Sequence, residues 1–331
     1  MKKLINNPDR VVEEMIEGMV AAYPNRIRRL PGTTVLVRKD APVQGKVGLV
    51  SGGGSGHEPS HAGYLGKGML DAAVCGEVFT SPTPDQVYEA IKAVDSGKGV
   101  LLIIKNYTGD IMNFEMAAEM AEAEGIKVAK VVVNDDVAVE NSTYTTGRRG
   151  IAGTVFVHKI AGAMAERGAS LEEVEAAAKK VIENVRSMGM ALTPCIVPAA
   201  GKPGFELGEK EMEIGMGIHG EPGIEKTEIR PADEIAQTLT DKILDDLKLG
   251  EKDKVAVMIN GLGGTPLMEL YIINRKVAEI LKGKNIEVHD TFVGNFMTSL
   301  EMAGCSVTLL KLDEQLTELL DAESDAIAFK R

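Results

Sequence analysis

Residues 46–59 read Lys46-Val-Gly-Leu-Val-Ser-Gly-Gly-Gly-Ser-Gly-His-Glu-Pro59, a short apolar run that leads into a glycine-rich segment. The run Lys46 to Val50 predicts a β-strand, and the glycines after it predict a loop at the carboxyl end of that strand. In α/β proteins, ligand-binding loops usually lie at this end of a strand. The stretch therefore predicts an α/β sheet with a ligand loop that carries His57.

The chain on either side alternates short β-branched runs with longer helical patterns, which predicts an α/β architecture. Several predicted strands are apolar throughout, as in a sheet covered on both faces. Ser170 and Glu173 form a capping box that predicts the start of a helix ending near Ser187. The predicted strands cover residues 34–37, 46–50, 72–75, 100–105, 128–133, 192–197, 213–218, 254–259, 286–289 and 307–310, and the predicted helices about 8–19, 84–94, 110–123, 151–167, 170–187, 231–247, 266–281 and 313–325.

A predicted pair of helices, residues 151–187, separates two series of strands and helices. We therefore predict two α/β domains, each a β-sheet flanked by helices. The N-terminal domain would cover residues 1–186 and the C-terminal domain residues 187–331.

Composition excludes several classes of protein. The 331 residues are 44% hydrophobic and 26% charged, as in ordinary globular proteins, and no apolar stretch approaches the roughly 20 residues of a membrane span. A net charge of −12 argues against a nucleic-acid partner. The N-terminus has no apolar run typical of a signal peptide, so we expect a cytoplasmic protein. The cysteines, at positions 75, 195 and 305, have no metal-binding spacing and are predicted to be reduced core thiols.

The glycines at 52, 53, 54 and 56 do not form a standard nucleotide site. A dinucleotide fingerprint requires G-x-G-x-x-G, but its sixth position falls on His57 when counted from Gly52 and on Pro59 when counted from Gly54. The phosphate loop G-x-x-x-x-G-K-[ST] does not occur in the chain either. A nucleotide-dependent oxidoreductase is therefore improbable.

A second glycine-rich segment, Gly215-Met-Gly-Ile-His-Gly-Glu-Pro-Gly223, also carries a histidine, His219. Glycines let the backbone approach a small ligand, and an imidazole can accept a proton or attack a carbonyl. The two segments together predict a site for a small polar substrate. The remaining histidines, at positions 61, 158 and 289, are predicted to have structural roles.

Three further features leave alternatives open. Asp110 follows the predicted strand 100–105. Its side chain either caps the next helix or is a carboxylate that orients or deprotonates a substrate hydroxyl. The segment Asn260-Gly-Leu-Gly-Gly-Thr-Pro266 is either an anion site at a helix N-terminus or a tight turn. The pair Arg148-Arg149 is either an anion or partner contact or part of a solvated loop.

Six segments rich in glycine, proline and polar residues follow one another along the chain. They are Ser51-Gly-Gly-Gly-Ser-Gly-His-Glu-Pro59, Gly76-Glu-Val-Phe-Thr-Ser-Pro-Thr-Pro84, Lys105-Asn-Tyr-Thr-Gly-Asp110, Thr146-Gly-Arg-Arg-Gly150, Val197-Pro-Ala-Ala-Gly-Lys-Pro203 and Gly217-Ile-His-Gly-Glu-Pro-Gly223. In this order they resemble the substrate-binding K subunit of bacterial dihydroxyacetone kinases that depend on the phosphotransferase system. The resemblance runs from near the first helix to the end of the chain.

The resemblance implies a homodimeric subunit that binds dihydroxyacetone as a covalent hemiaminal, with His219 as the matching histidine. His57 and Asp110 match the residues that contact the substrate hydroxyls and carry out acid/base catalysis. The resemblance also implies a set of residues that line the substrate pocket, namely Gly54, Ser55, Gly56 and Lys105.

The resemblance places the cofactors on other chains. We expect this chain to bind neither metal nor cofactor, with magnesium and ADP or ATP held by an L subunit, which a phosphotransferase-system M subunit recharges from phosphoenolpyruvate. The alternative is a noncatalytic paralogue that binds dihydroxyacetone and acts as co-activator of a transcriptional regulator. Because both His57 and Asp110 are present, the sequence favours the enzyme.

Overall fold

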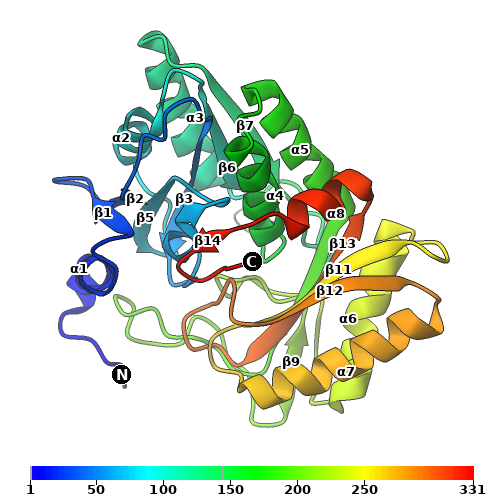
Figure 1. Ribbon diagram of the computed structural model, residues 1–331. Coiled ribbons are helices and arrows are strands. Elements are labelled where there is room, and N and C mark those ends of the chain that lie inside the picture. The colour runs from blue at the N-terminus through cyan, green and yellow to red at the C-terminus, as the bar shows by residue number, and fades with distance from the viewer. Residues whose placement is uncertain (1, 143–144) are drawn as a thin grey trace.

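The computed structural model describes residues 2–142 and 145–331, which form two six-stranded sheets, a small two-stranded sheet and flanking helices (Figure 1). The predicted α/β class is confirmed. No helix in the described ranges is both long and apolar enough to cross a lipid bilayer.

The first sheet has the strand order β1-β2-β5-β3-β6-β7. Its four strands from β5 to β7 are parallel, whereas β2 pairs antiparallel with β5 and β1 pairs antiparallel with β2. Helices α2 and α3 pack against the sheet, and α1 contacts β1 and β5. The bounds are β1 Ile27–Arg29, β2 Val35–Arg38, β3 Gly48–Ser55, β5 Ala72–Val78, β6 Val100–Lys105, β7 Val128–Val133, α1 Val11–Ala22, α2 Pro84–Val94 and α3 Thr108–Ala123.

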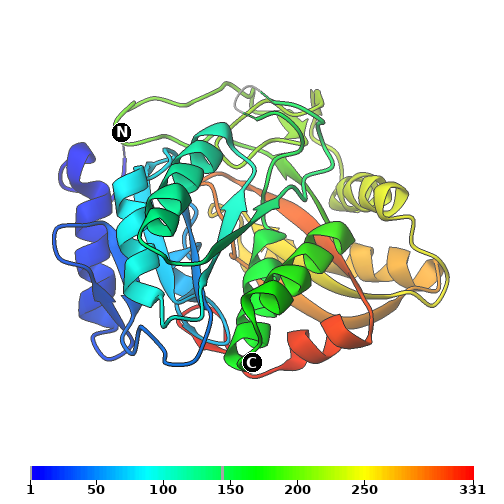
Figure 2. The ribbon, with the colours of Figure 1, turned by 90° about the horizontal axis from the view of Figure 1, so that it is seen from above.

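The second sheet has the order β10-β9-β8-β13-β11-β12, and only β11 and β12 pair in parallel. Helices α6 and α7 cover one face of it, on the side of the molecule away from α1 and α2 (Figure 2). The bounds are β8 Val185–Ala191, β9 Glu211–Ile214, β10 Glu225–Glu228, β11 Lys254–Gly261, β12 Glu287–Gly294, β13 Gly304–Leu312, α6 Ala232–Leu247 and α7 Leu267–Gly283.

Helices α4 (Thr154–Glu166) and α5 (Leu171–Asn184) connect the two sheets, because α5 contacts β6 and β7 of the first and β13 of the second. The chain end then returns to the N-terminal half. Helix α8 (Glu314–Asp321) packs on α4, and β14 (Asp325–Ala326) pairs with β4 (Gly66–Lys67). One hydrophobic cluster contains residues of both halves, from Val12 to Phe329. The division at residues 186 and 187 stays a prediction.

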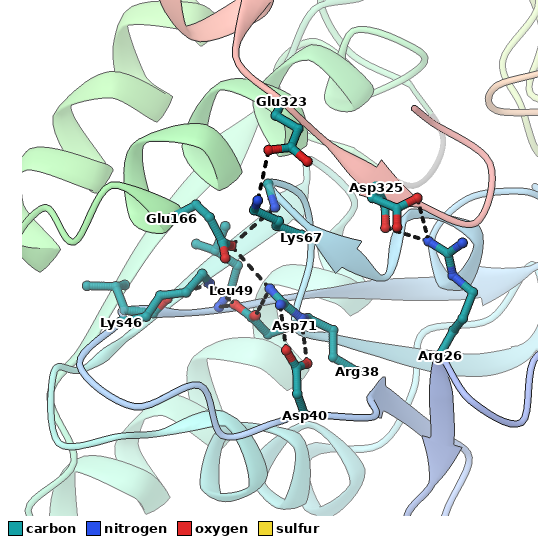
Figure 3. A network of polar contacts seen from close by, with 12 residues as sticks. Arg26, Arg38, Asp40, Lys46, Leu49, Lys67, Asp71, Glu166, Glu323 and Asp325 are labelled. Atoms are coloured by element: carbon teal, nitrogen blue, oxygen red, sulfur yellow. Dashed lines mark hydrogen bonds and ion pairs between the residues drawn. The ribbon is translucent and has the colours of Figure 1, made fainter. Parts of the chain in front are cut away.

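A network of buried charges ties these parts together (Figure 3). The Asp71 carboxylate accepts hydrogen bonds from Lys46, at 2.5 Å, and from Arg38, at 3.2 Å. Arg38 also pairs with Glu166, the last residue of α4, at 3.2 Å. Around this network, Lys67 pairs with Glu323 of the C-terminal segment. These contacts hold α4 against the first sheet and the chain end against β4.

Some elements differ from the prediction. The helix that begins at the confirmed Ser170 capping box ends at Asn184, and the strand expected at 192–197 lies instead at Val185–Ala191, as β8. The short strands β1, β4, β10 and β14 were not predicted, because two to four residues carry too little periodicity. All three cysteines are buried and unpaired, as expected of core thiols.

The predicted glycine loop is partly strand, because β3 continues through Ser55. Glycine permits this continuation where the neighbouring chain is close. A Cβ at Gly52 would lie 2.4 Å from the Val74 carbonyl oxygen of β5, and one at Gly54 would lie 2.5 Å from the backbone nitrogen of Thr80. The segment therefore turns away from the sheet only after Ser55, which places His57 beyond the strand's carboxyl end.

Candidate functional site

The two histidines of the glycine-rich segments meet, although they are 162 positions apart. The Nε2 atoms of His57 and His219 are 3.1 Å apart, with the ring planes 72° from parallel. His57 follows β3 of the first sheet, and His219 follows β9 of the second. The site therefore lies where the segments that follow β3 and β9 meet, so it requires both halves of the chain.

His57 is held with its Nε2 atom toward His219. Its Nδ1 donates a hydrogen bond to the Thr298 carbonyl oxygen, at 2.7 Å, and Phe79 stacks on the ring with centroids 5.1 Å apart. Burial, with the neighbouring charges of His219 and Lys105, lowers the pKa of His57 well below its ordinary value. At neutral pH, His57 is therefore uncharged and its Nε2 can accept a proton.

His219 is oriented by a buried carboxylate. Glu221 accepts hydrogen bonds from the His219 Nδ1 and from its backbone nitrogen, both at 2.9 Å. Burial acts to raise the pKa of Glu221, but His219 and Arg149 outweigh it and hold the pKa at about 2. The carboxylate has room because residue 217 is glycine, whose Cβ would lie 2.1 Å from a Glu221 oxygen. Because Nδ1 is hydrogen-bonded to Glu221, Nε2 is the His219 ring nitrogen that faces His57.

Arg149 fixes the loop that carries His219. The side chain is fully buried, pairs with Asp136 at 2.7 Å and donates to the Gly215 carbonyl oxygen at 2.7 Å. Its neighbour Arg148 pairs with Asp246 of α6. Arg149 is therefore enclosed by the fold and positions the loop, whereas Arg148 is partly exposed, with 31% of its side chain accessible, and its alternatives stay open.

Asp110 and Lys105 lie beside the histidines. Asp110 is in the first turn of α3, is 5% exposed and has one carboxylate oxygen 3.9 Å from the Lys105 Nζ. Lys105 is fully buried, and burial lowers its pKa although Asp110 and Glu221 act to raise it. A Cβ at Gly53 would lie 2.5 Å from this Nζ, so the glycine makes room for the lysine.

A cavity of about 700 Å³ opens above these groups. Gly54, Asp110 and His219 line it directly, whereas His57 and Lys105 lie buried behind the lining. Ser55 and Gly56 line a separate hollow of about 300 Å³, together with residues of α1 and the N-terminal segment, so their contact with substrate stays a prediction. The lining residues are Gly54, Phe79, Thr80, Ser81, Tyr107, Thr108, Gly109, Asp110, Asn113 and His219.

Other sequence candidates support the site from behind. The His61 Nε2 accepts from Lys105 at 3.1 Å, and the His61 Nδ1 lies 2.9 Å from the His158 Nε2. Asn260 of the third glycine-rich segment accepts from two backbone nitrogens at 296 and 297, next to Thr298. His289 pairs with Asp321 outside the site. These contacts are internal and agree with the structural roles predicted for His61, His158 and His289.

Several residues of the site had no assigned role in the sequence analysis. Glu221, Phe79 and Tyr107 lie within the six segments that carry the family resemblance, and this position was the one sequence feature that could have pointed to them. The Tyr107 ring meets the His219 ring edge-on, with centroids 4.5 Å apart. Thr298 has no such signal, since only the fold brings it to His57. Within residues 2–142 and 145–331, no cluster of three His, Cys, Asp or Glu side chains is placed to hold a metal ion.

Comparison with known proteins gives consistent matches over the whole chain. The model of the Dak1 domain matches residues 17–328. The chain is 59% identical to the dihydroxyacetone-binding subunit of a PTS-dependent dihydroxyacetone kinase of Listeria innocua, covering 99% of this chain and 100% of that protein. It superposes on the dihydroxyacetone kinase of C. freundii with a TM-score of 0.92 and 39% identity, covering 99% of this chain and 60% of the longer one. A dihydroxyacetone kinase operon co-activator superposes with a TM-score of 0.89 and 39% identity, over 96% of this chain and 97% of that one.

Proposed function

The chain belongs to the Dak1 domain family, and on that basis we propose that it is the dihydroxyacetone-binding subunit of a phosphotransferase-system-dependent dihydroxyacetone kinase. Full-length similarity to a subunit of that description supports the assignment. The observation that carries the chemistry is the approach of the His57 and His219 Nε2 atoms to 3.1 Å beside the cavity.

The first step is covalent binding. The lone pair of the His219 Nε2 attacks the carbonyl carbon of dihydroxyacetone, and the carbonyl π electrons move to oxygen, which takes up a proton from water in the cavity to give the hemiaminal hydroxyl. The imidazole ring gains positive charge as the new bond forms. The Glu221 carboxylate, 2.9 Å from Nδ1, stabilises that charge.

Covalent binding explains how so small a substrate is selected. Dihydroxyacetone has six heavy atoms, and the best small ligands gain at most about 1.5 kcal/mol per atom, so noncovalent contacts discriminate poorly against glycerol. Glycerol has no carbonyl group and cannot form the hemiaminal. His219 therefore makes the carbonyl itself the criterion for tight binding.

The second step is transfer of a phosphoryl group to a terminal hydroxyl. Phosphoryl transfer needs an aligned nucleophile and an acceptor for the hydroxyl proton. His57 is uncharged and presents Nε2, which suits it to accept that proton. Asp110, held beside Lys105, orients the hydroxyl from the opposite side.

The nucleotide and magnesium are assigned to a partner L subunit, recharged through the M subunit of the phosphotransferase system. Support comes from the failed nucleotide motifs and from the lack of a metal-binding cluster among the described residues. We further propose a cytoplasmic homodimer. A co-activator role is the second candidate, supported by the superposition on a co-activator, but the 59% identity is to a kinase subunit.

The test is dihydroxyacetone phosphate formation by the purified chain with a matching L subunit, magnesium and ATP. We expect turnover by the wild type and a loss in His57→Ala and His219→Ala of about 10²-fold or more, since each removes a reacting group. His289→Ala, outside the site, is the control and should keep wild-type turnover. No turnover by the wild type, while a known K subunit works with the same L subunit, would refute the kinase assignment.

A further inference from the structure

Helix α3 carries an exposed methionine face made of Met112, Met116 and Met120. These side chains are 57%, 52% and 41% exposed, which is unusual for three large apolar residues on one helix. Their spacing of four residues places them on one side of the helix, as a stripe about 12 Å long. The opposite side of α3 is buried against the first sheet through Phe114 and Ala117.

The methionine face continues the mouth of the substrate cavity. Gly109 and Asn113 of α3 line that cavity. With about 100° of rotation per residue, Gly109, Asn113 and the three methionines fall within about 100° of one another around the helix. A protein that covers the cavity mouth from this side therefore also lies on the methionine face.

The chemistry of the site determines which protein covers the mouth. The hydroxyl to be phosphorylated is held near Asp110, at the first turn of α3, and the transferred phosphorus must come within about 3.5 Å of it. The sequence contains neither of the two nucleotide-binding motifs considered above. Among the described residues, no cluster of His, Cys, Asp or Glu is placed to hold the magnesium ion of a nucleotide. The phosphoryl donor therefore arrives on another protein that closes over the mouth.

We propose that the methionine face of α3 is the docking surface for the subunit that carries the phosphoryl donor. The proposal rests on the proposed kinase function. Methionine is flexible and polarisable, which suits a surface that must bind and release its partner in every catalytic cycle. Glu119, three residues after Met116, lies along one edge of the stripe and is exposed, so we expect the partner to present apolar side chains with a basic one beside them.

A second apolar group provides a matched control. Met268 and Ile272 of α7 are 74% and 42% exposed and are also four residues apart. Helix α7 covers the second sheet, far from α3 in both views (Figures 1 and 2). A change that acts through general surface polarity would have the same effect on either helix. A change that acts through docking would not.

The experiment compares the double variant Met112→Glu, Met116→Glu with the control Met268→Glu, Ile272→Glu. Turnover is measured against the concentration of the L subunit, and dihydroxyacetone binding is measured separately by calorimetry. We expect the α3 variant to need at least about tenfold more L subunit for half-maximal turnover, a loss of about 1.4 kcal/mol in docking, with unchanged maximal turnover and unchanged dihydroxyacetone affinity. The control should need the wild-type concentration.

Two outcomes would overturn the proposal. One is an unchanged half-saturating concentration of L subunit in the α3 variant. The other is a change of oligomeric state in light scattering, which would assign the methionine face to a second copy of the chain. Failure of the underlying kinase function gives a different result, because the wild type itself would then show no turnover at any L subunit concentration.

Discussion

Replacement of Glu221 by glutamine tests how the structure activates His219. The buried carboxylate accepts one hydrogen bond from the His219 Nδ1 and one from its backbone nitrogen, both at 2.9 Å. Glutamine keeps the shape but carries no charge, so it cannot stabilise the positive imidazole of the proposed hemiaminal. A glutamine NH₂ group turned toward Nδ1 would also favour the tautomer that has hydrogen on Nε2, which cannot attack a carbonyl.

The magnitude follows from the charge of the lost partner. A hydrogen bond to a charged group contributes about 1.5–3 kcal/mol, so the dissociation constant for dihydroxyacetone should rise by about 10- to 150-fold. Calorimetric titration with dihydroxyacetone measures this constant directly. The control is Glu213→Gln, because Glu213 accepts a hydrogen bond from the Gly223 backbone of the same loop, at 2.6 Å, without touching His219.

The control should bind dihydroxyacetone within about threefold of the wild type, since the loop keeps its other contacts through Arg149. Glu221→Gln with wild-type affinity would refute the reasoning. A comparable loss in both variants would also contradict it, because the effect would then come from the loop as a whole.

Three further predictions follow from the buried groups. Gly53→Ala places a methyl group 2.5 Å from the Lys105 Nζ at a φ of +147°, and should weaken dihydroxyacetone binding by about tenfold in calorimetry, while Gly18→Ala, with open space around it, should not. Arg149→Met leaves the Asp136 carboxylate buried without its partner and should lower the free energy of urea unfolding by about 3–5 kcal/mol. Adding Asp136→Leu should restore much of the lost free energy, and no restoration would count against an ion-pair effect. Burial lowers the pKa of His158 to about 3, so between about pH 3 and pH 6.5 the unfolded chain binds a proton that the folded chain does not. The free energy of unfolding therefore falls as pH decreases below about 6.5, and His158→Gln should reduce the slope of this free energy against pH by about 1.4 kcal/mol per pH unit. Equal slopes in both proteins would contradict the assignment.

The sequence predicted the elements with strong periodicity. Strands such as β6 and β7 match their predicted ranges. A short run of apolar, β-branched residues bounded by turn-forming residues is typical of a buried strand. The capping box at Ser170 located the start of α5 correctly. The end of that helix was misplaced, because residues 185–187 continue a helical pattern locally. Their pairing with β13 in the second sheet decides their conformation.

In the candidate site too, features set by neighbouring residues could be predicted, whereas contacts between distant parts of the chain could not. His57 and His219 were recognisable from their glycine-rich surroundings, and the resemblance joined them in one site. The Nδ1 partner of His57, the Thr298 carbonyl, could not be predicted because it lies 241 positions away and is a backbone group. Arg149 was ambiguous, since its sequence context does not reveal that folding buries it beneath the His219 loop. Such contacts depend on how the two sheets face each other.

The most direct test of the covalent mechanism is ¹³C NMR of dihydroxyacetone labelled at its carbonyl carbon, mixed with the wild-type chain or with His219→Ala. The account predicts that the bound carbon of the wild-type complex moves from the ketone region to that of a tetrahedral carbon bonded to nitrogen and oxygen, and that His219→Ala abolishes this signal. A bound carbon that stays in the ketone region of the wild-type spectrum would contradict the account.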